Sequence, residues 1–175
     1  MRYSFVIPVL CLLLPAGTAW SAEHAALREA GWLQSIRLEP HRVRLTAKLD
    51  TGAKSSALHA IDLQRYSENG HPRVRFSLYK DHQEQDGPEL TYDLPVKDVV
   101  KIKRRGGLPP DERVVVELSF CLDGEVMRAD FSLDDRSNFN YPALLGREFL
   151  AGRFVINPAE TFVFDYDCPK AGGAR

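Results

Sequence analysis

The chain has 175 residues and a formal net charge of −1, and 44% of its residues are hydrophobic. This length suits one domain with a core of its own. A charge so close to zero gives no electrostatic attraction to nucleic acid, so no nucleic-acid partner is expected. The basic cluster Lys101–Arg105 is interpreted as a solvated loop rather than a phosphate site.

The first 22 residues have the composition of a secretory signal peptide. Arg2 supplies a positive start, residues 5–14 form a mostly apolar run, and residues 16–22 are rich in small side chains. The apolar run is about half as long as a membrane-spanning helix, although an uncleaved anchor remains an alternative. The sequence therefore predicts a periplasmic or secreted protein with no stable membrane span after cleavage.

The rest of the chain consists of short β-type segments between turns. Residues 43–49 and 74–79 alternate apolar and polar side chains, as half-buried strands do. Asp123-Gly124 is a tight hairpin signal between two further strand candidates. The other expected strands are residues 32–38, 57–63, 90–100, 114–120, 126–133, 154–156 and 161–164, with a turn at 157–160.

This pattern predicts an all-β barrel or sandwich with at most two short helices. The expected organisation is a lead-in over residues 23–31, helical over residues 23–30, then one domain over residues 32–167 and a tail over residues 168–175.

The tetrapeptide Asp50-Thr51-Gly52-Ala53 directly follows the alternating segment that ends at Leu49. A carboxylate on a tight turn at a strand end is held rigidly and faces outward. Gly52 permits a close backbone approach or an unusual backbone angle. The Thr51 hydroxyl can brace the loop, and the small Ala53 lets a second loop pack close. Asp50 is thus the candidate catalytic acid, although Asp-Thr-Gly also suits a plain turn.

A second element lies far downstream, at residues 143–147. An Asp-Thr-Gly-Ala turn after an apolar strand, followed near the C-terminal end by two apolar residues and Gly-Arg, resembles the retropepsin-like aspartic proteases. The match is closest to a bacterial branch labelled ATP-dependent zinc proteases, on the segments Lys48–Ala60, Asp135–Asn138 and Tyr141–Arg147.

The resemblance implies a retropepsin-like fold in which the downstream element threads behind the catalytic loop and supports it. The residues implied as support are Thr51, Gly52, Ala53, Leu144, Leu145, Gly146 and Arg147. Ordinary retropepsins carry an acid after Asp-Thr-Gly-Ala that pairs with the downstream arginine. Here Lys54 and Ser55 follow the turn, so Asp135 is the candidate ion-pair partner of Arg147.

The residues themselves do not support the zinc and ATP in that label. The five histidines are scattered, with no His-Glu-x-x-His spacing, and the sequence has no Gly-x-x-x-x-Gly-Lys-Ser/Thr phosphate loop. We therefore expect neither a metal nor another cofactor.

Two cysteines remain beyond the predicted signal peptide, Cys121 and Cys168. An exported protein meets an oxidising compartment, so the two could form a disulfide. Two buried free thiols are the alternative.

The sequence contains a single Asp-Thr-Gly, so the catalytic hypothesis requires a homodimer that brings two Asp50 carboxylates together. Such a pair shares one proton and can hydrolyse a peptide or protein substrate. Two other functions stay open: a catalytically silent peptide-binding or scaffolding module, and a peptidase for unusual amide bonds such as glutamyl linkages.

Overall fold

The computed structural model describes residues 26–79, 89–103, 105–107 and 109–168. In chain order its elements are β1 (Arg28–Leu38), β2 (Val43–Leu49), β3 (Ser56–His59), β4 (Ile61–Glu68), β5 (His71–Tyr79), β6 (Glu89–Pro95), β7 (Asp98–Ile102), the 3₁₀ turn η1 (Arg105–Gly107), β8 (Asp111–Leu122), β9 (Glu125–Asp134), β10 (Ala143–Leu145), α1 (Arg147–Leu150) and β11 (Phe154–Thr161).

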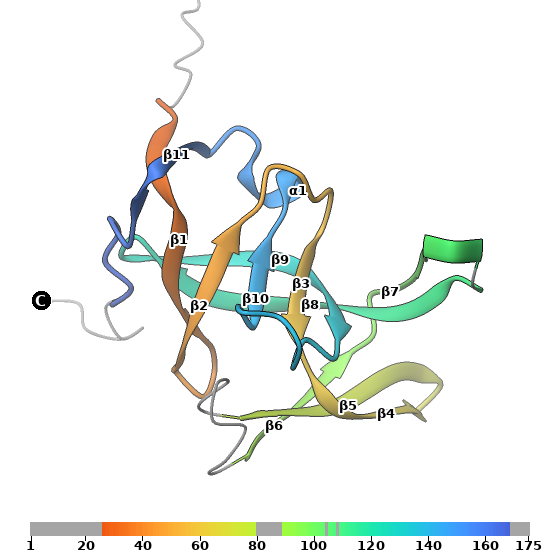
Figure 1. The fold of residues 1–175 in the computed structure, drawn as a ribbon. Helices are drawn as coiled ribbons and strands as arrows, with labels where there is room; N and C mark the ends of the chain where they lie inside the picture. The colour runs from red at the N-terminus through yellow and green to blue at the C-terminus, as the bar shows by residue number, and fades with distance from the viewer. Residues whose placement is uncertain (1–25, 80–88, 104, 108, 169–175) are drawn as a thin grey trace, which may run out of the picture.

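Two sheets hold these strands (Figure 1). Eight strands form one sheet in the order β11-β1-β2-β10-β3-β9-β8-β7, and β4, β5 and β6 form the other. Strand β1 also pairs with β8, with Arg37 opposite Cys121 and Leu38 opposite Phe120. The larger sheet therefore curls back onto itself around the core. The predicted all-β fold is confirmed.

Strand β2 shows how the sequence pattern produces this arrangement. Successive side chains of a strand point to opposite faces, and its four apolar residues, Val43, Leu45, Ala47 and Leu49, are all buried. The intervening polar positions are more accessible. The chain thus enters the Asp50 turn from a strand fixed by its apolar face. Other large side chains of the same core are Ile36, Leu58, Phe76, Phe120, Phe131, Leu145 and Phe149.

The hairpin predicted at Asp123-Gly124 is confirmed. It joins β8 to β9, and both residues have positive φ, 55° and 71°. Positive φ at both central positions is the geometry of the turn that best matches the twist of paired strands, and Gly and Asp adopt it readily.

The start of the domain differs from the prediction. A helix was expected over residues 23–30, but β1 begins at Arg28. It pairs in parallel with β11, and the first pair is Arg28 opposite Phe154. Sheet pairing with a segment about 125 residues later therefore overrides the local pattern. Residues 1–22, the predicted signal peptide, and most of the C-terminal tail lie outside the described residues. Within the described ranges, no helix is long and apolar enough to cross a membrane.

Two predicted strands are each divided between the sheets. The expected strand over residues 57–63 is broken at Ala60, whose N–H donates to the Asp134 carbonyl, and Asp62 has a positive φ. The expected strand over residues 90–100 becomes β6 and β7. Between them Val96 N–H donates to Pro72 and Lys97 N–H to Val115, which lie in different sheets. The chain changes sheet at both breaks, which local periodicity cannot reveal.

The turn expected at residues 157–160 lies inside a continuous strand, β11. Asn157 does form a local turn contact, because its side-chain oxygen accepts from Ala159 N–H at 2.9 Å. The pairing with β1 then shifts register between Gly31–Asn157 and Leu33–Thr161, as in a bulge. A separate strand was expected at residues 161–164. Instead β11 ends at Thr161, because the next residue, Phe162, has a positive φ.

Candidate active site

Asp50 lies at the carboxyl end of β2, on the turn that leads to β3. Strand β10 runs parallel to β2, with Leu145 opposite Leu49, and the Asp50 N–H donates to the Leu145 carbonyl at 2.9 Å. The sheet therefore continues up to the first residue of the turn. The Asp50 side chain is 22% exposed, so its carboxylate is rigidly placed and still open to solvent.

The turn closes on the Asp50 carboxylate. Gly52 N–H donates to Oδ1 at 3.0 Å, and Ala53 N–H donates to the Asp50 carbonyl at 3.2 Å. A Cβ at Gly52 would lie 3.2 Å from Oδ1. The close neighbour is therefore a side-chain oxygen, whereas the sequence interpretation expected a close backbone approach or an unusual backbone angle. Thr51 accepts, through its carbonyl, a hydrogen bond from Arg147 Nη1 at 2.8 Å.

The downstream element packs directly behind this turn, as the resemblance implied. Arg147 N–H donates to the Ala53 carbonyl and Glu148 N–H to the Lys54 carbonyl, each at 3.0 Å. Gly146 comes so close to Ser55 that an added Cβ would lie 2.6 Å from its carbonyl carbon. Leu144 and Leu145 belong to β10, between β2 and β3. The structure thus brings together the predicted supporting residues.

Ser56 is a supporting residue that the sequence interpretation missed. Its hydroxyl accepts from Gly146 N–H at 3.1 Å, and its carbonyl accepts from the Ser132 hydroxyl at 3.1 Å. Ser56 is buried and is bonded both to Ser132 of β9 and to Gly146, which directly follows β10. A serine six residues beyond the candidate acid was the available signal, but serine also suits any loop.

A lysine contacts the candidate acid. Lys48 Nζ donates to Asp50 Oδ2 at 3.0 Å. Burial by itself raises the pKa of Asp50, but the hydrogen bond and charge of Lys48, with the N–H groups of Gly52 and Ala53, outweigh it and lower the pKa below its ordinary value. Arg136, which is buried, adds a weaker electrostatic attraction to Asp50. The described site therefore favours the carboxylate form.

The structure corrects the expected ion pair between Arg147 and Asp135. Arg147 is exposed at the start of α1 and its guanidinium binds the Thr51 carbonyl. Asp135 instead lies with one oxygen 3.7 Å from His59 Nδ1. The two residues make different contacts because they follow different strands. Arg147 comes after β10, beside the Asp50 turn, whereas Asp135 comes directly after β9.

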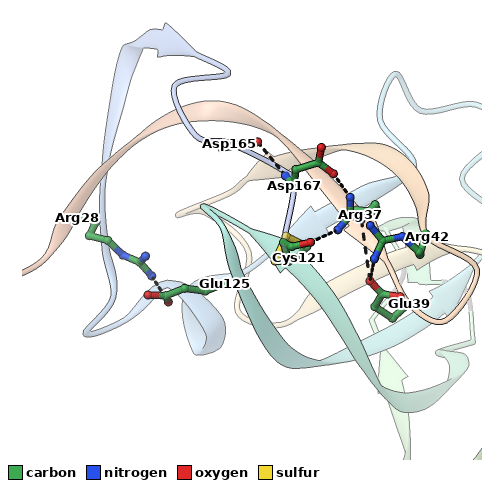
Figure 2. The surroundings of a disulfide bond; sticks show 9 residues. Arg28, Arg37, Glu39, Arg42, Cys121, Glu125, Asp165 and Asp167 are labelled. Atoms are coloured by element: carbon green, nitrogen blue, oxygen red, sulfur yellow. Dashed lines mark hydrogen bonds and ion pairs between the residues drawn. A yellow bond between two sulfur atoms is a disulfide. The ribbon is translucent and has the colours of Figure 1, made fainter. Parts of the chain in front are cut away.

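Cys121 and Cys168 form a disulfide, the first of the two states left open for them. Cys121 is on β8, and the disulfide holds the segment after β11 against it (Figure 2). The buried Arg37 donates to the Cys168 carbonyl at 3.0 Å and forms an ion pair with Asp167. This corner, formed by Arg37, Cys121 and residues 167–168, is called the disulfide corner below.

A cleft of about 570 Å³ begins beside the Asp50 turn, at Lys54 and Ser55, and extends along β7. Its charged lining is balanced, with Lys54, Lys97 and Lys101 against Asp98, Asp130 and Glu148. Within the described ranges, no group of three or more His, Cys, Asp or Glu side chains could hold a metal ion.

The chain is similar to two proteins named probable alpha-L-glutamate ligase: that of Shewanella pealeana (29% identity over 120 residues) and that of Desulfotalea psychrophila (29% over 115 residues). These matches cover 67% and 66% of this chain but only 25% and 24% of the relatives, so the chain corresponds to about a quarter of their length.

Among solved structures, the protein Lpg0085 of Legionella pneumophila, described as having unknown function, matches with a TM-score of 0.67 and 29% identity. The match covers 79% of this chain and 98% of that one. The family model for RimB-like proteins, described as the retropepsin-like aspartic endopeptidase RimB, matches residues 30–166. The chain therefore belongs to the RimB-like family of retropepsin-like aspartic endopeptidases.

Proposed function

We propose that this protein is an aspartic peptidase that hydrolyses peptide bonds with Asp50. The observation that carries the proposal is the Asp50 turn itself. A partly exposed carboxylate follows a buried strand, and hydrogen bonds from Gly52 and to Leu145 fix its position. An open cleft begins a few residues further along the chain, at Lys54 and Ser55. A carboxylate held in this way can act as a general base on a bound water.

The proposed mechanism needs a second copy of the chain, because one copy has a single Asp-Thr-Gly. A two-fold axis would place two Asp50 carboxylates together, and two such groups share one proton. The ionised carboxylate removes a proton from water, which attacks the scissile carbonyl carbon. The protonated carboxyl donates its proton to the carbonyl oxygen. In the collapse of the tetrahedral intermediate, the proton taken from water passes to the leaving nitrogen and the other carboxylate takes a proton from one hydroxyl, so the amine and the acid are released and the pair again holds one proton.

We also propose that the protein acts after export, in the periplasm or outside the cell. The composition of residues 1–22 supports this proposal, and so does the disulfide between Cys121 and Cys168. Disulfides persist in oxidising compartments and are rare in reducing ones.

A second candidate substrate is an amide bond that involves glutamate. Two observations favour it. The relatives named probable alpha-L-glutamate ligase contain a region similar to this chain. In addition, the exposed cationic side chains of Lys48 and Arg147 contact the Asp50 turn, and such charges attract an acidic peptide.

A digest of two peptide sets tests both candidates: a mixed-sequence library and peptides that carry glutamate tails. The parent protein and Asp50→Asn are compared across acidic and neutral pH, with and without a chelator, after sedimentation has given the oligomeric state. We expect hydrolysis by the parent alone, fastest on the acid side and indifferent to the chelator. Full activity of Asp50→Asn would exclude the mechanism. Absence of cleavage by a confirmed dimer would favour a peptide-binding module.

A further inference from the structure

Lys48 and Asp50 are two positions apart, so their side chains leave the end of β2 on the same face. Their charged atoms meet at 3.0 Å, between Nζ and Oδ2. The other carboxylate oxygen, Oδ1, accepts from Gly52 N–H at 3.0 Å. Both oxygens of the candidate base therefore have a donor within the same chain, and these two donors define one orientation of the carboxylate.

The other charged groups near this pair have different roles. The Arg147 guanidinium is bound to the Thr51 carbonyl at 2.8 Å, and Lys54 pairs with Glu148 at 3.5 Å. Arg136 is buried, and its Nε donates to the Tyr141 carbonyl at 3.2 Å. Lys48 is therefore the cation that directly contacts the Asp50 carboxylate. Its side chain is 40% exposed, so it can move when a substrate enters.

We propose that Lys48 is a positioning residue for Asp50, which it holds in the orientation and the ionised form that accept a proton from water. This inference rests on the proposed peptidase function. In a symmetric pair of Asp50 carboxylates, two Lys48 ammonium groups stabilise negative charge on the pair. The singly protonated pair, which is the active form, is then reached at a lower pH than without the lysines.

The test is a set of three variants of the full chain. Lys48→Met removes the charge and keeps much of the side-chain volume, and Lys48→Arg keeps the charge. Arg65→Met is the matched control, because it removes one positive charge from the exposed β4 of the smaller sheet. Thermal unfolding first establishes that each variant is folded.

Two measurements are made on each variant. The side-chain carboxyl ¹³C resonance of Asp50, assigned by its loss in Asp50→Asn, is followed against pH, and the pH–rate profile of peptide hydrolysis is recorded. In Lys48→Met we expect the pKa of Asp50 to rise and both limbs of the rate profile to move to higher pH. Lys48→Arg is expected to restore both toward the parent, and Arg65→Met to leave both unchanged.

An unchanged pKa of Asp50 in Lys48→Met would overturn the proposal. So would a loss of rate at every pH without a shift of the profile, because Lys48 would then act on the substrate itself. If the parent protein hydrolyses no peptide, the proposed function fails. The carboxyl titration still decides whether Lys48 lowers the pKa of Asp50.

Discussion

The Asp50 turn and the disulfide corner are both held in place by segments distant in sequence, but by different interactions. At the turn, backbone groups of residues 145–148 meet those of residues 50–54, and Ser56 adds a neutral side-chain contact. At the corner, a covalent bond and the buried charge of Arg37 hold residues 167–168. Side-chain changes at the turn should therefore affect chemistry, and changes at the corner should affect stability.

The largest expected effect follows from Asp50→Asn. Hydrolysis should fall by about 10²–10⁴-fold, because the carboxylate that accepts the proton is lost. The free energy of unfolding should change by less than about 1 kcal/mol, because the Lys48–Asp50 pair is partly exposed. Initial rates and urea denaturation measure the two quantities. A variant that loses several kcal/mol of stability would show that the turn depends on charge after all.

Removal of the disulfide tests the second region, the disulfide corner. Cys121 and Cys168 are 47 residues apart, so Cys168→Ser should lower the free energy of unfolding by about 2–4 kcal/mol, mainly through a less restricted unfolded chain. Hydrolysis well below the melting temperature should remain near the parent rate. Dithiothreitol should destabilise the parent and leave the variant unchanged. Equal stability of parent and variant in denaturant would contradict this.

Two glycines, one beside the Asp50 turn and one distant from it in β1, allow the same substitution to be compared. A Cβ at Gly146 would collide with the Ser55 carbonyl group, and a Cβ at Gly31 would collide with the Glu160 carbonyl group. Each alanine substitution should lower the free energy of unfolding by about 1–3 kcal/mol, the usual range for overpacking. Activity measured on the folded fraction should fall only in Gly146→Ala, because that clash displaces the Asp50 turn. Equal loss of activity in both variants would remove the distinction.

The smallest effect is expected at Arg147, and Arg37 of the disulfide corner is its counterpart. Arg147 is exposed and makes one hydrogen bond to the turn, so Arg147→Ala should cost less than about 1 kcal/mol of stability. Arg37 is 5% exposed and binds both Cys168 and Asp167, so Arg37→Ala should cost about 1–3 kcal/mol. Thermal and urea denaturation of both variants compare them. A larger loss in Arg147→Ala than in Arg37→Ala would show that the turn depends on this hydrogen bond more than the corner depends on Arg37.

Much of the local structure was predictable because it depends on neighbouring residues. The alternation over residues 43–49 predicts β2, and Asp123-Gly124 predicts the β8–β9 hairpin. The Asp50 turn and its support by residues 143–147 were also expected, although that expectation came from resemblance to a family. The parts that failed, such as the helix over residues 23–30 and the strand over residues 90–100, are those where pairing across the fold decides the element.

The sequence by itself therefore determined the strand pattern, the position of the candidate acid and the two residues able to form a disulfide. Only the tertiary structure decided which distant groups meet: Ser56 with Gly146, Arg147 with Thr51 rather than Asp135, and Cys121 with Cys168. The physical reason is the range of the interactions. Periodicity and turn chemistry act over a few residues, whereas these partners are chosen by the register of strands that are distant in sequence.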